Sequence, residues 1–212
     1  MRRVWTLAVV ASGWVASSHA GVLLPRDLDG NTNNGAEAYY DPVQNITWMT
    51  DWRQGTDGGM NWPNALAWAA GLTLGGLDDW RLPQMKPGAG IPDAGTCQAW
   101  NCANTEIGYL WYVVLGNKAL TLSNRGPFEH MSSGPYWTAA AVDSDEAWAF
   151  RTGNGFQFEA LMSNRYAVAA VRDGDPFASA VPEPSTAALT IAGLLAKVGA
   201  SRRRTPPSRA LA

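Results

Sequence analysis

The sequence predicts a single α+β domain that lies between two terminal targeting segments. Two stretches with helical periodicity lie before residue 116, and a run of short alternating stretches occupies residues 135–172. Helices and antiparallel strands that are segregated along a chain are typical of α+β folds. No internal repeat is visible, and the length left between the targeting segments, about 160 residues, suffices for one core. We therefore expect the domain to span residues 21–172.

Two short stretches near the start of the domain have the composition of strands. Residues 38–41 and 45–49 are rich in aromatic and β-branched side chains and flank a Pro-Val-Gln turn, which predicts a hairpin. A polar segment rich in Asp, Asn and Gly precedes them and predicts Asx turns. The alternation of Asp27, Asp29 and Asn31 in this segment also fits the first ligands of a calcium loop. The later ligands of an EF-hand are not at the required spacing, so the Asx turn is the favoured interpretation.

The first helix is predicted to begin at Trp62 and to end near a pair of glycines. Asn61 can cap its first turn, in which Pro63 is tolerated. Trp62, Leu66 and Ala69 recur on one face, so this face is expected to pack against the core.

The second half of the domain predicts one helix followed by strands. Residues 105–115 have helical periodicity, and the Gly-Asn pair that follows them is a stop signal. An Asn-Gly pair at residues 154–155 predicts a tight hairpin, because it supplies the positive φ that such a turn needs. The predicted strands are residues 135–138, 146–151, 155–158 and 166–172, and residues 173–180 are expected to form a linker.

The domain is rich in tryptophan, which predicts an aromatic core. Each large ring buries a wide area, so tryptophans can hold together a fold that is rich in loops. Some of these rings could instead lie on the surface and stack on sugars. We expect most of the nine to be buried: Trp48, Trp52, Trp62, Trp68, Trp80, Trp100, Trp111, Trp137 and Trp148.

Two cysteines, Cys97 and Cys102, are the only ones in the chain. A protein that is exported meets an oxidising compartment, where such a pair closes a small disulfide loop if the two Cα atoms come within about 7 Å. Two isolated cysteines without neighbouring histidines do not make a metal site. We therefore expect a disulfide, no metal and no cofactor.

The first twenty residues have the order of a secretory signal peptide. Arg2 and Arg3 precede an apolar run, and the small residues Ser18 and Ala20 lie at the spacing that signal peptidase accepts. The run is too short for a stable membrane span. We expect residues 1–20 to be removed after Ala20; the alternative is a buried N-terminal helix.

The other end of the chain has the order of a membrane-directed sorting segment. Residues 187–200 form a short apolar stretch, and a basic cluster follows it. Positive charge tends to remain on the cytoplasmic side, so the cluster acts as a stop to transfer. Two prolines prevent a helix from extending into the preceding segment. The basic cluster consists of Arg202, Arg203 and Arg204.

Residues 181–204 resemble the PEP-CTERM sorting signal of exported bacterial proteins. The recognition tripeptide would be Pro182-Glu183-Pro184, followed by the apolar stretch and the arginine cluster. In that family a membrane protease called exosortase cuts near the tripeptide, and the product reaches the cell surface or the exopolysaccharide matrix. Lys197 interrupts the apolar stretch, and residues 205–212 continue as an expected disordered tail. The alternative is a disordered Pro/Ala-rich terminus.

A set of short motifs between these ends carries a second resemblance. The motifs are Trp80-Arg81-Leu82-Pro83, Tyr136-Trp137-Thr138, Ala147-Trp148-Ala149-Phe150 and Val171-Arg172. In this order they resemble the Lcl C-terminal-domain-like family, over residues 39–172. The resemblance implies a C-type-lectin-like fold. The calcium-binding triplets of calcium-dependent lectins are absent from the sequence, so the resemblance carries over fold rather than ligand.

The shared motifs predict structural roles. Trp80 is expected to fill the core, and Pro83 to end the strand that carries Leu82. Arg81 is expected to pair with Asp78 or Asp79 or to bond nearby carbonyl oxygens; the alternative is a ligand clamp. Trp137 and Trp148, on successive strands, are expected to pair across the sheet.

Charge and composition exclude several classes of function. Residues 21–180 hold nine basic and seventeen acidic residues, a net charge of −8, whereas nucleic acids and sulfated polysaccharides require a cationic surface. No phosphate-binding loop occurs. Glu129, His130 and Ser132 are too close in sequence for a typical triad, so a polar turn is favoured over a catalytic site. A second acidic cluster, Asp143, Asp145 and Glu146, is interpreted as a solvated turn rather than a calcium site.

These observations predict a non-enzymatic protein that crosses the inner membrane of a Gram-negative bacterium. It would be anchored transiently and then reach the cell surface or the extracellular matrix. Its expected partners are signal peptidase, exosortase and a neutral exopolysaccharide, and not nucleic acid. The alternatives are a structural or protein-interaction module of the biofilm matrix and an unrecognised carbohydrate-active enzyme.

Overall fold

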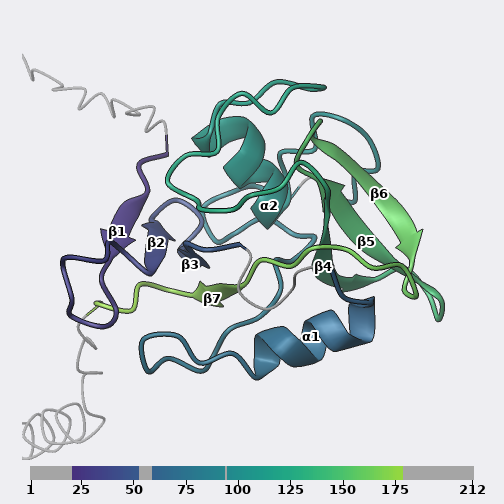
Figure 1. The fold of residues 1–212 in the computed structure, drawn as a ribbon. Helices are drawn as coiled ribbons and strands as arrows, with labels where there is room; N and C mark the ends of the chain where they lie inside the picture. The colour runs from purple at the N-terminus through teal and green to yellow at the C-terminus, as the bar shows by residue number, and fades with distance from the viewer. Residues whose placement is uncertain (1–20, 53–58, 94, 179–212) are drawn as a thin grey trace, which may run out of the picture. The chain divides into compact units, whose positions relative to one another are not determined.

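The computed structural model describes residues 21–52, 59–93 and 95–178. The predicted signal peptide and sorting segment lie outside these ranges. In the described ranges the chain forms seven strands, two α-helices and one π-helical turn, with antiparallel pairing within each sheet (Figure 1). The α+β class expected from the sequence is confirmed.

The first sheet brings the two ends of the domain together. Its strands are β1 (Leu24–Arg26), β2 (Ala38–Asp41), β3 (Ile46–Met49) and β7 (Val171–Asp173), in the order β1-β2-β3-β7. β2 and β3 form the expected hairpin. The buried Asp41 carboxylate holds the turn by accepting hydrogen bonds from the backbone N–H groups of Val43 and Gln44.

The C-terminal strand extends into the segment that was expected to be a linker. Asp173 is the last residue of β7, and the Arg26 guanidinium binds both carboxylate oxygens of Asp175 at 2.7 Å. Thr47 also donates a hydrogen bond to the carbonyl of Gly174. The sequence pattern gave no sign of these contacts, because their partners lie more than a hundred residues earlier in the chain.

The second sheet consists of three antiparallel strands. These are β4 (Pro135–Ala141), β5 (Glu146–Arg151) and β6 (Phe156–Leu161), in the order β4-β5-β6. Gly155 lies in the turn just before β6 with φ of 75°, and an added Cβ would lie 2.5 Å from the ring of Trp111. A residue without a side chain is therefore required at this turn both by conformation and by space.

The two predicted helices form, and both end earlier or less regularly than expected. α1 (Trp62–Ala70) is capped by the Asn61 side chain, as predicted, and ends at Gly71. α2 (Glu106–Tyr109) begins after Thr105, whose hydroxyl accepts a hydrogen bond from the N–H of Gly108. It continues as the π-helical turn η1 (Leu110–Val114). In Figure 1, α2 lies between the two sheets and α1 runs along one side of the domain.

The core is aromatic, as the tryptophan content predicted. Six of the nine tryptophans are buried: Trp48, Trp52, Trp80, Trp111, Trp137 and Trp148. Trp48 stacks on Trp52 with ring centroids 5.8 Å apart, and Phe128 packs against both rings. Trp62 and Trp68 are half-buried, and Trp100 is the most exposed of the nine, with 44% of its surface exposed.

Candidate ligand-binding site

A half-buried arginine, Arg81, connects three segments that are distant in sequence. Its guanidinium donates two hydrogen bonds of 2.8 Å to the carboxylate of Glu106, and it also pairs with Asp173. Glu106 is almost completely buried and also accepts a hydrogen bond of 2.7 Å from the N–H of Gln84. Burial alone would lower the pKa of Arg81, but Glu106 and Asp173 outweigh it and raise this pKa above its ordinary value.

Of the partners expected for Arg81, the two preceding aspartates were wrong, whereas a bond to a nearby carbonyl oxygen is confirmed, because its Nη1 donates a hydrogen bond of 3.2 Å to the carbonyl of Leu82. The backbone of Arg81 forms two hydrogen bonds of 2.8 Å with that of Val171, which fixes Arg81 beside β7. From there its side chain reaches Glu106 and Asp173 rather than the preceding aspartates. Asp79 pairs instead with Arg172 through two hydrogen bonds of 2.8 Å, which lower the pKa of the Asp79 carboxyl group.

The other three residues of the Trp80-Arg81-Leu82-Pro83 motif are also fixed by contacts within the fold. Trp80 is 3% exposed and donates a hydrogen bond from its indole nitrogen to the carbonyl of Leu77. Leu82 is buried in the core cluster beneath α1, and the carbonyl of Pro83 accepts a hydrogen bond of 2.8 Å from Ala139 of β4. The motif thus connects the first sheet, α2 and the second sheet.

The expected pairing of Trp137 with Trp148 was also wrong. In the register of β4 and β5, Trp137 lies opposite Ala149, so the neighbouring Trp148 presents its side chain to the other face of the sheet. The ring of Trp137 packs instead on Tyr166, with centroids 4.5 Å apart. The prediction assumed that Trp137 lies opposite Trp148. The register of the sheet differs from this by one residue, which turns Trp148 to the other face.

Beside this framework lies a small loop closed by a disulfide between Cys97 and Cys102, whose Cα atoms are 5.6 Å apart. The fully buried Gln157 of β6 holds the loop. Its backbone N–H donates to the carbonyl of Ala99, its side-chain amide donates to the carbonyl of Cys97, and its side-chain oxygen accepts from the Thr105 hydroxyl. The loop is therefore attached to both β6 and the start of α2.

The loop presents Trp100 to solvent. The Trp100 ring packs on Phe156 with centroids 4.5 Å apart, and Phe156 stacks on Phe158 at 6.0 Å with an interplanar angle of 18°. Both phenylalanines are half-buried on the edge strand β6. We call Trp100, Phe156 and Phe158 the aromatic platform. No pattern in the sequence distinguished Trp100 from the eight other tryptophans of the domain.

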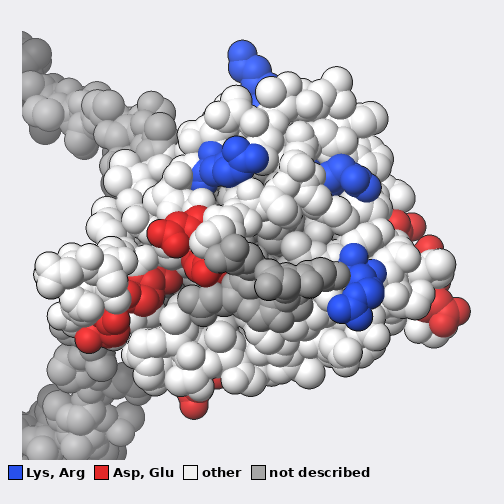
Figure 2. Space-filling model, in the orientation of Figure 1, with Lys and Arg blue, Asp and Glu red and all other residues white. Residues whose placement is uncertain are grey.

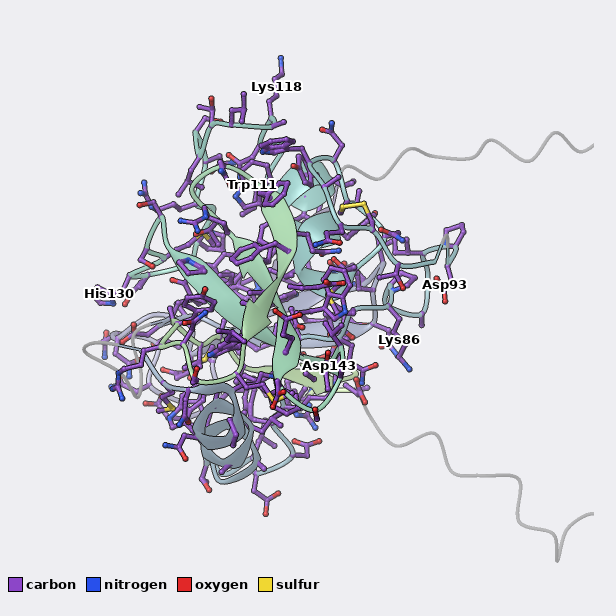
Figure 3. All side chains as sticks on the ribbon, turned by 90° about the vertical axis from the view of Figure 1, so that its right-hand side faces the viewer. Lys86, Asp93, Trp111, Lys118, His130 and Asp143 are labelled. Carbon is purple, nitrogen blue, oxygen red and sulfur yellow. A yellow bond between two sulfur atoms is a disulfide. The ribbon has the colours of Figure 1, made fainter. Side chains whose placement is uncertain are left out.

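Two open cavities lie at the loop or next to it. One, of about 620 Å³, is lined by the disulfide loop together with Thr96 and the amide side chains of Asn101 and Asn104. A second, of about 490 Å³, is lined by Lys86, Asp93 and, again, Thr96. Figure 3 shows Lys86 and Asp93 on the same side of the domain as the disulfide, whereas His130 points away on the opposite side.

The residues considered for catalysis are not arranged as a triad. His130 lies 2.7 Å from a carboxylate oxygen of Asp51, and both side chains are partly exposed. The Ser132 hydroxyl bonds to the hydroxyl of Tyr136. In the described ranges no hydrogen bond joins His130 to Ser132 or to Glu129. The Ser132 hydroxyl also accepts a hydrogen bond from the N–H of Gly134, so the segment is a polar turn.

The two acidic clusters form turns. Asp143 accepts hydrogen bonds of 2.8 and 2.9 Å from the N–H groups of Asp145 and Glu146, which lower its pKa. Asp29 accepts one of 2.7 Å from the N–H of Asn31, which lowers its pKa in the same way.

The N-terminal cluster contains a member that the sequence did not suggest. Carboxylate oxygens of Asp27, Asp29 and Glu37 lie within 4.8 Å of one another. Asp27 and Glu37 also accept backbone hydrogen bonds, from Gly30 and Leu28. The three carboxylates thus stabilise the local turns.

Within the described residues, no helix combines the length and the apolar character needed to cross a bilayer.

Comparison with known proteins identifies the domain. No curated protein matches the chain. A family model described as the Lcl C-terminal domain matches residues 37–172, which is more than half of the chain and extends from the start of the first hairpin into β7. The chain therefore belongs to the Lcl C-terminal domain family.

Proposed function

We propose that the domain is a non-enzymatic module that binds a neutral polysaccharide outside the cytoplasm. The exposed indole of Trp100 supports this proposal most directly, because it is large, apolar and held in place rather than buried. Aromatic side chains that keep one accessible face and have a firm support suit stacking on the apolar face of a sugar ring. The amide groups of Asn101 and Asn104 in the adjoining cavity supply both donors and acceptors for hydroxyl groups.

The charge distribution favours a neutral ligand over an acidic one. On the face shown in Figure 2, basic side chains are separated from one another and do not merge into a continuous patch. The domain between the targeting segments has a net charge of −8. A sulfated or phosphorylated chain would be repelled at low ionic strength, whereas a neutral glycan would not.

We further propose that the domain is C-type-lectin-like and is exported by the two terminal segments. Signal peptidase would remove residues 1–20, and exosortase would recognise Pro182-Glu183-Pro184 while the arginines at 202–204 hold the chain transiently in the inner membrane. The disulfide between Cys97 and Cys102 supports an oxidising compartment. The product would act at the cell surface or in the extracellular matrix.

An array of neutral and acidic polysaccharides tests the binding activity. The exported protein would be applied as wild type and as Trp100→Ala, with Phe177→Ala as the matched control because Phe177 is also an exposed aromatic residue. We expect Trp100→Ala to weaken binding about tenfold, which corresponds to about 1.4 kcal/mol, and the control to bind as wild type. An absence of binding to every polysaccharide would refute the activity and favour a structural or protein-interaction module.

Cell fractionation tests the sorting. Removal of the tripeptide 182–184 is expected to leave the protein in the inner-membrane fraction, whereas the unaltered chain reaches the surface or the medium. An identical distribution of both forms would contradict sorting by this motif.

A further inference from the structure

Three neighbouring cavities follow the loop between Pro83 and Thr105, and they share walls. The cavity next to the disulfide loop and the middle cavity are both lined by Thr96. The middle cavity shares Gln84 and Lys86 with a third cavity of about 300 Å³. We call this series of three cavities the loop trough. Adjacent cavities in this series touch a common residue. A ligand in the form of a chain can therefore extend from one cavity into the next and contact all three.

Two residues of the third cavity carry buried polar atoms without a partner in the described part of the chain. Gln44 and Arg81 both line it. The side-chain oxygen of Gln44 and the Nε of Arg81 are buried and have no hydrogen-bond partner among the described residues. The amide nitrogen of Gln44 is committed to Asp41 and to the carbonyl of Glu106, so the orientation of the amide group is fixed. Unpaired buried polar atoms are costly, and native proteins contain few of them.

The Gln44 oxygen is an acceptor and the Arg81 Nε is a donor, but both atoms are buried beneath the cavity surface, so they make the wall polar without contacting a ligand directly. The charges at the cavity offset each other, because Glu106 and Asp173 neutralise Arg81. In the middle cavity Lys86 is accompanied by Asp93. The trough therefore offers polar groups along its length without an excess of positive charge, which fits hydroxyl-rich chains rather than polyanions.

We infer that the loop trough binds an extended neutral polysaccharide chain across three adjoining subsites, from the disulfide loop to the Arg81 cavity. This inference rests on the proposed function and adds the form of the ligand: an internal stretch of a chain rather than a single terminal sugar. Lys86 and Thr96 would contact the chain where it passes from one subsite to the next. Both are exposed, so they can be replaced without opening the core.

The inference predicts that affinity depends on chain length. The probes are the cello-, malto- and laminari-oligosaccharides from dimer to hexamer, titrated calorimetrically against the exported protein. In the series that binds, we expect the hexamer to bind at least about tenfold more tightly than the dimer. Lys86→Ala, and separately Thr96→Trp to obstruct the passage between two subsites, are expected to remove most of this gain.

Two controls separate the possible failures. Lys118→Ala also removes one exposed lysine, at a site far from the trough in Figure 3, and should leave the length dependence unchanged. Trp100→Ala should weaken the binding of dimer and hexamer alike, because it acts on the aromatic platform.

Equal binding of dimer and hexamer would overturn the inference of a trough and leave the proposed function standing. If none of the three series binds, this inference fails, and the polysaccharide array decides whether the proposed function fails with it. Unchanged melting temperatures of the variants establish that they are folded.

Discussion

Trp80 and Trp100 are both tryptophans outside the helices and strands, yet they serve opposite purposes. Trp80 is 3% exposed, donates its indole N–H to the carbonyl of Leu77 and precedes the arginine that joins the first sheet to α2. Trp100 is 44% exposed and lies on a disulfide-closed loop whose backbone carbonyls are held by Gln157. The comparison shows that residue type does not decide the role of an aromatic side chain. The backbone bonds of the surrounding segment decide whether the ring faces the core or solvent.

The largest expected difference between the two regions is in stability. Trp80→Ala should lower the free energy of unfolding by about 3–5 kcal/mol, because it leaves a cavity in the core. Trp100→Ala should lower it by less than about 1 kcal/mol, because the ring is largely solvated. Urea denaturation of the two variants measures both values. Similar losses would mean that Trp100 is a core residue and would refute its assignment to a binding platform.

Ion pairs provide a second contrast. Arg81→Ala should cost about 3 kcal/mol, because the carboxylate of Glu106 then remains buried without its charged partner. Arg172→Ala is the matched control: it also removes one positive charge, but its partner Asp79 is 55% exposed, so a loss below about 1 kcal/mol is expected. Denaturation at pH 7 tests both. If the two variants were equally stable, the Arg81 pair would not be a structural anchor.

The disulfide is expected to matter more for binding than its small loop suggests. Replacing Cys97 and Cys102 together with Ser should lower stability by about 2 kcal/mol, the value expected for so short a loop. Glycan affinity should fall to the level of Trp100→Ala, because the loop no longer holds the ring on Phe156. Denaturation and calorimetry on the same preparation separate the two effects. Full affinity in the double variant would show that β6 and Gln157 suffice to position Trp100.

The smallest effect is expected from the pair between Arg26 and Asp175, which fastens the C-terminal end of the domain. The hydrogen bond from Arg26 lowers the pKa of Asp175 in the folded protein, so the pair stabilises the fold above the unfolded pKa, about 4. Its contribution, below about 1 kcal/mol, is lost as the pH falls through the lowered folded pKa. Unfolding curves between pH 2 and 6 should therefore converge at low pH for wild type and Asp175→Asn. Parallel curves across this range would contradict the linkage.

The features that the sequence predicted correctly are those with local causes. The cap of α1 by Asn61, the hairpin of β2 and β3, and the turn at Gly155 each depend on residues within a few positions of one another. The class of fold follows from the order of such elements. The burial of most tryptophans could also be predicted, because a domain of this size has few other ways to bury so much aromatic surface.

The features that the sequence missed depend on distant pairing. Glu106 and Asp173 are 25 and 92 residues from Arg81, so nearby aspartates were the wrong candidates for its partners. The faces of Trp137 and Trp148 depend on strand register, and the turn η1 interrupts a helix whose sequence pattern is regular. The exposure of Trp100 follows from the way Gln157 holds the loop, which no spacing in the sequence indicates.

The arrangement around Gln157 has a thermodynamic consequence for recognition. This single buried amide joins the disulfide loop, the edge of the second sheet and the hydroxyl that caps α2. A loop that is already ordered before it meets a ligand loses little conformational entropy on association, so more of the contact energy remains as affinity. Preorganisation of this kind would allow a domain with only one strongly exposed tryptophan to retain a weakly interacting sugar chain.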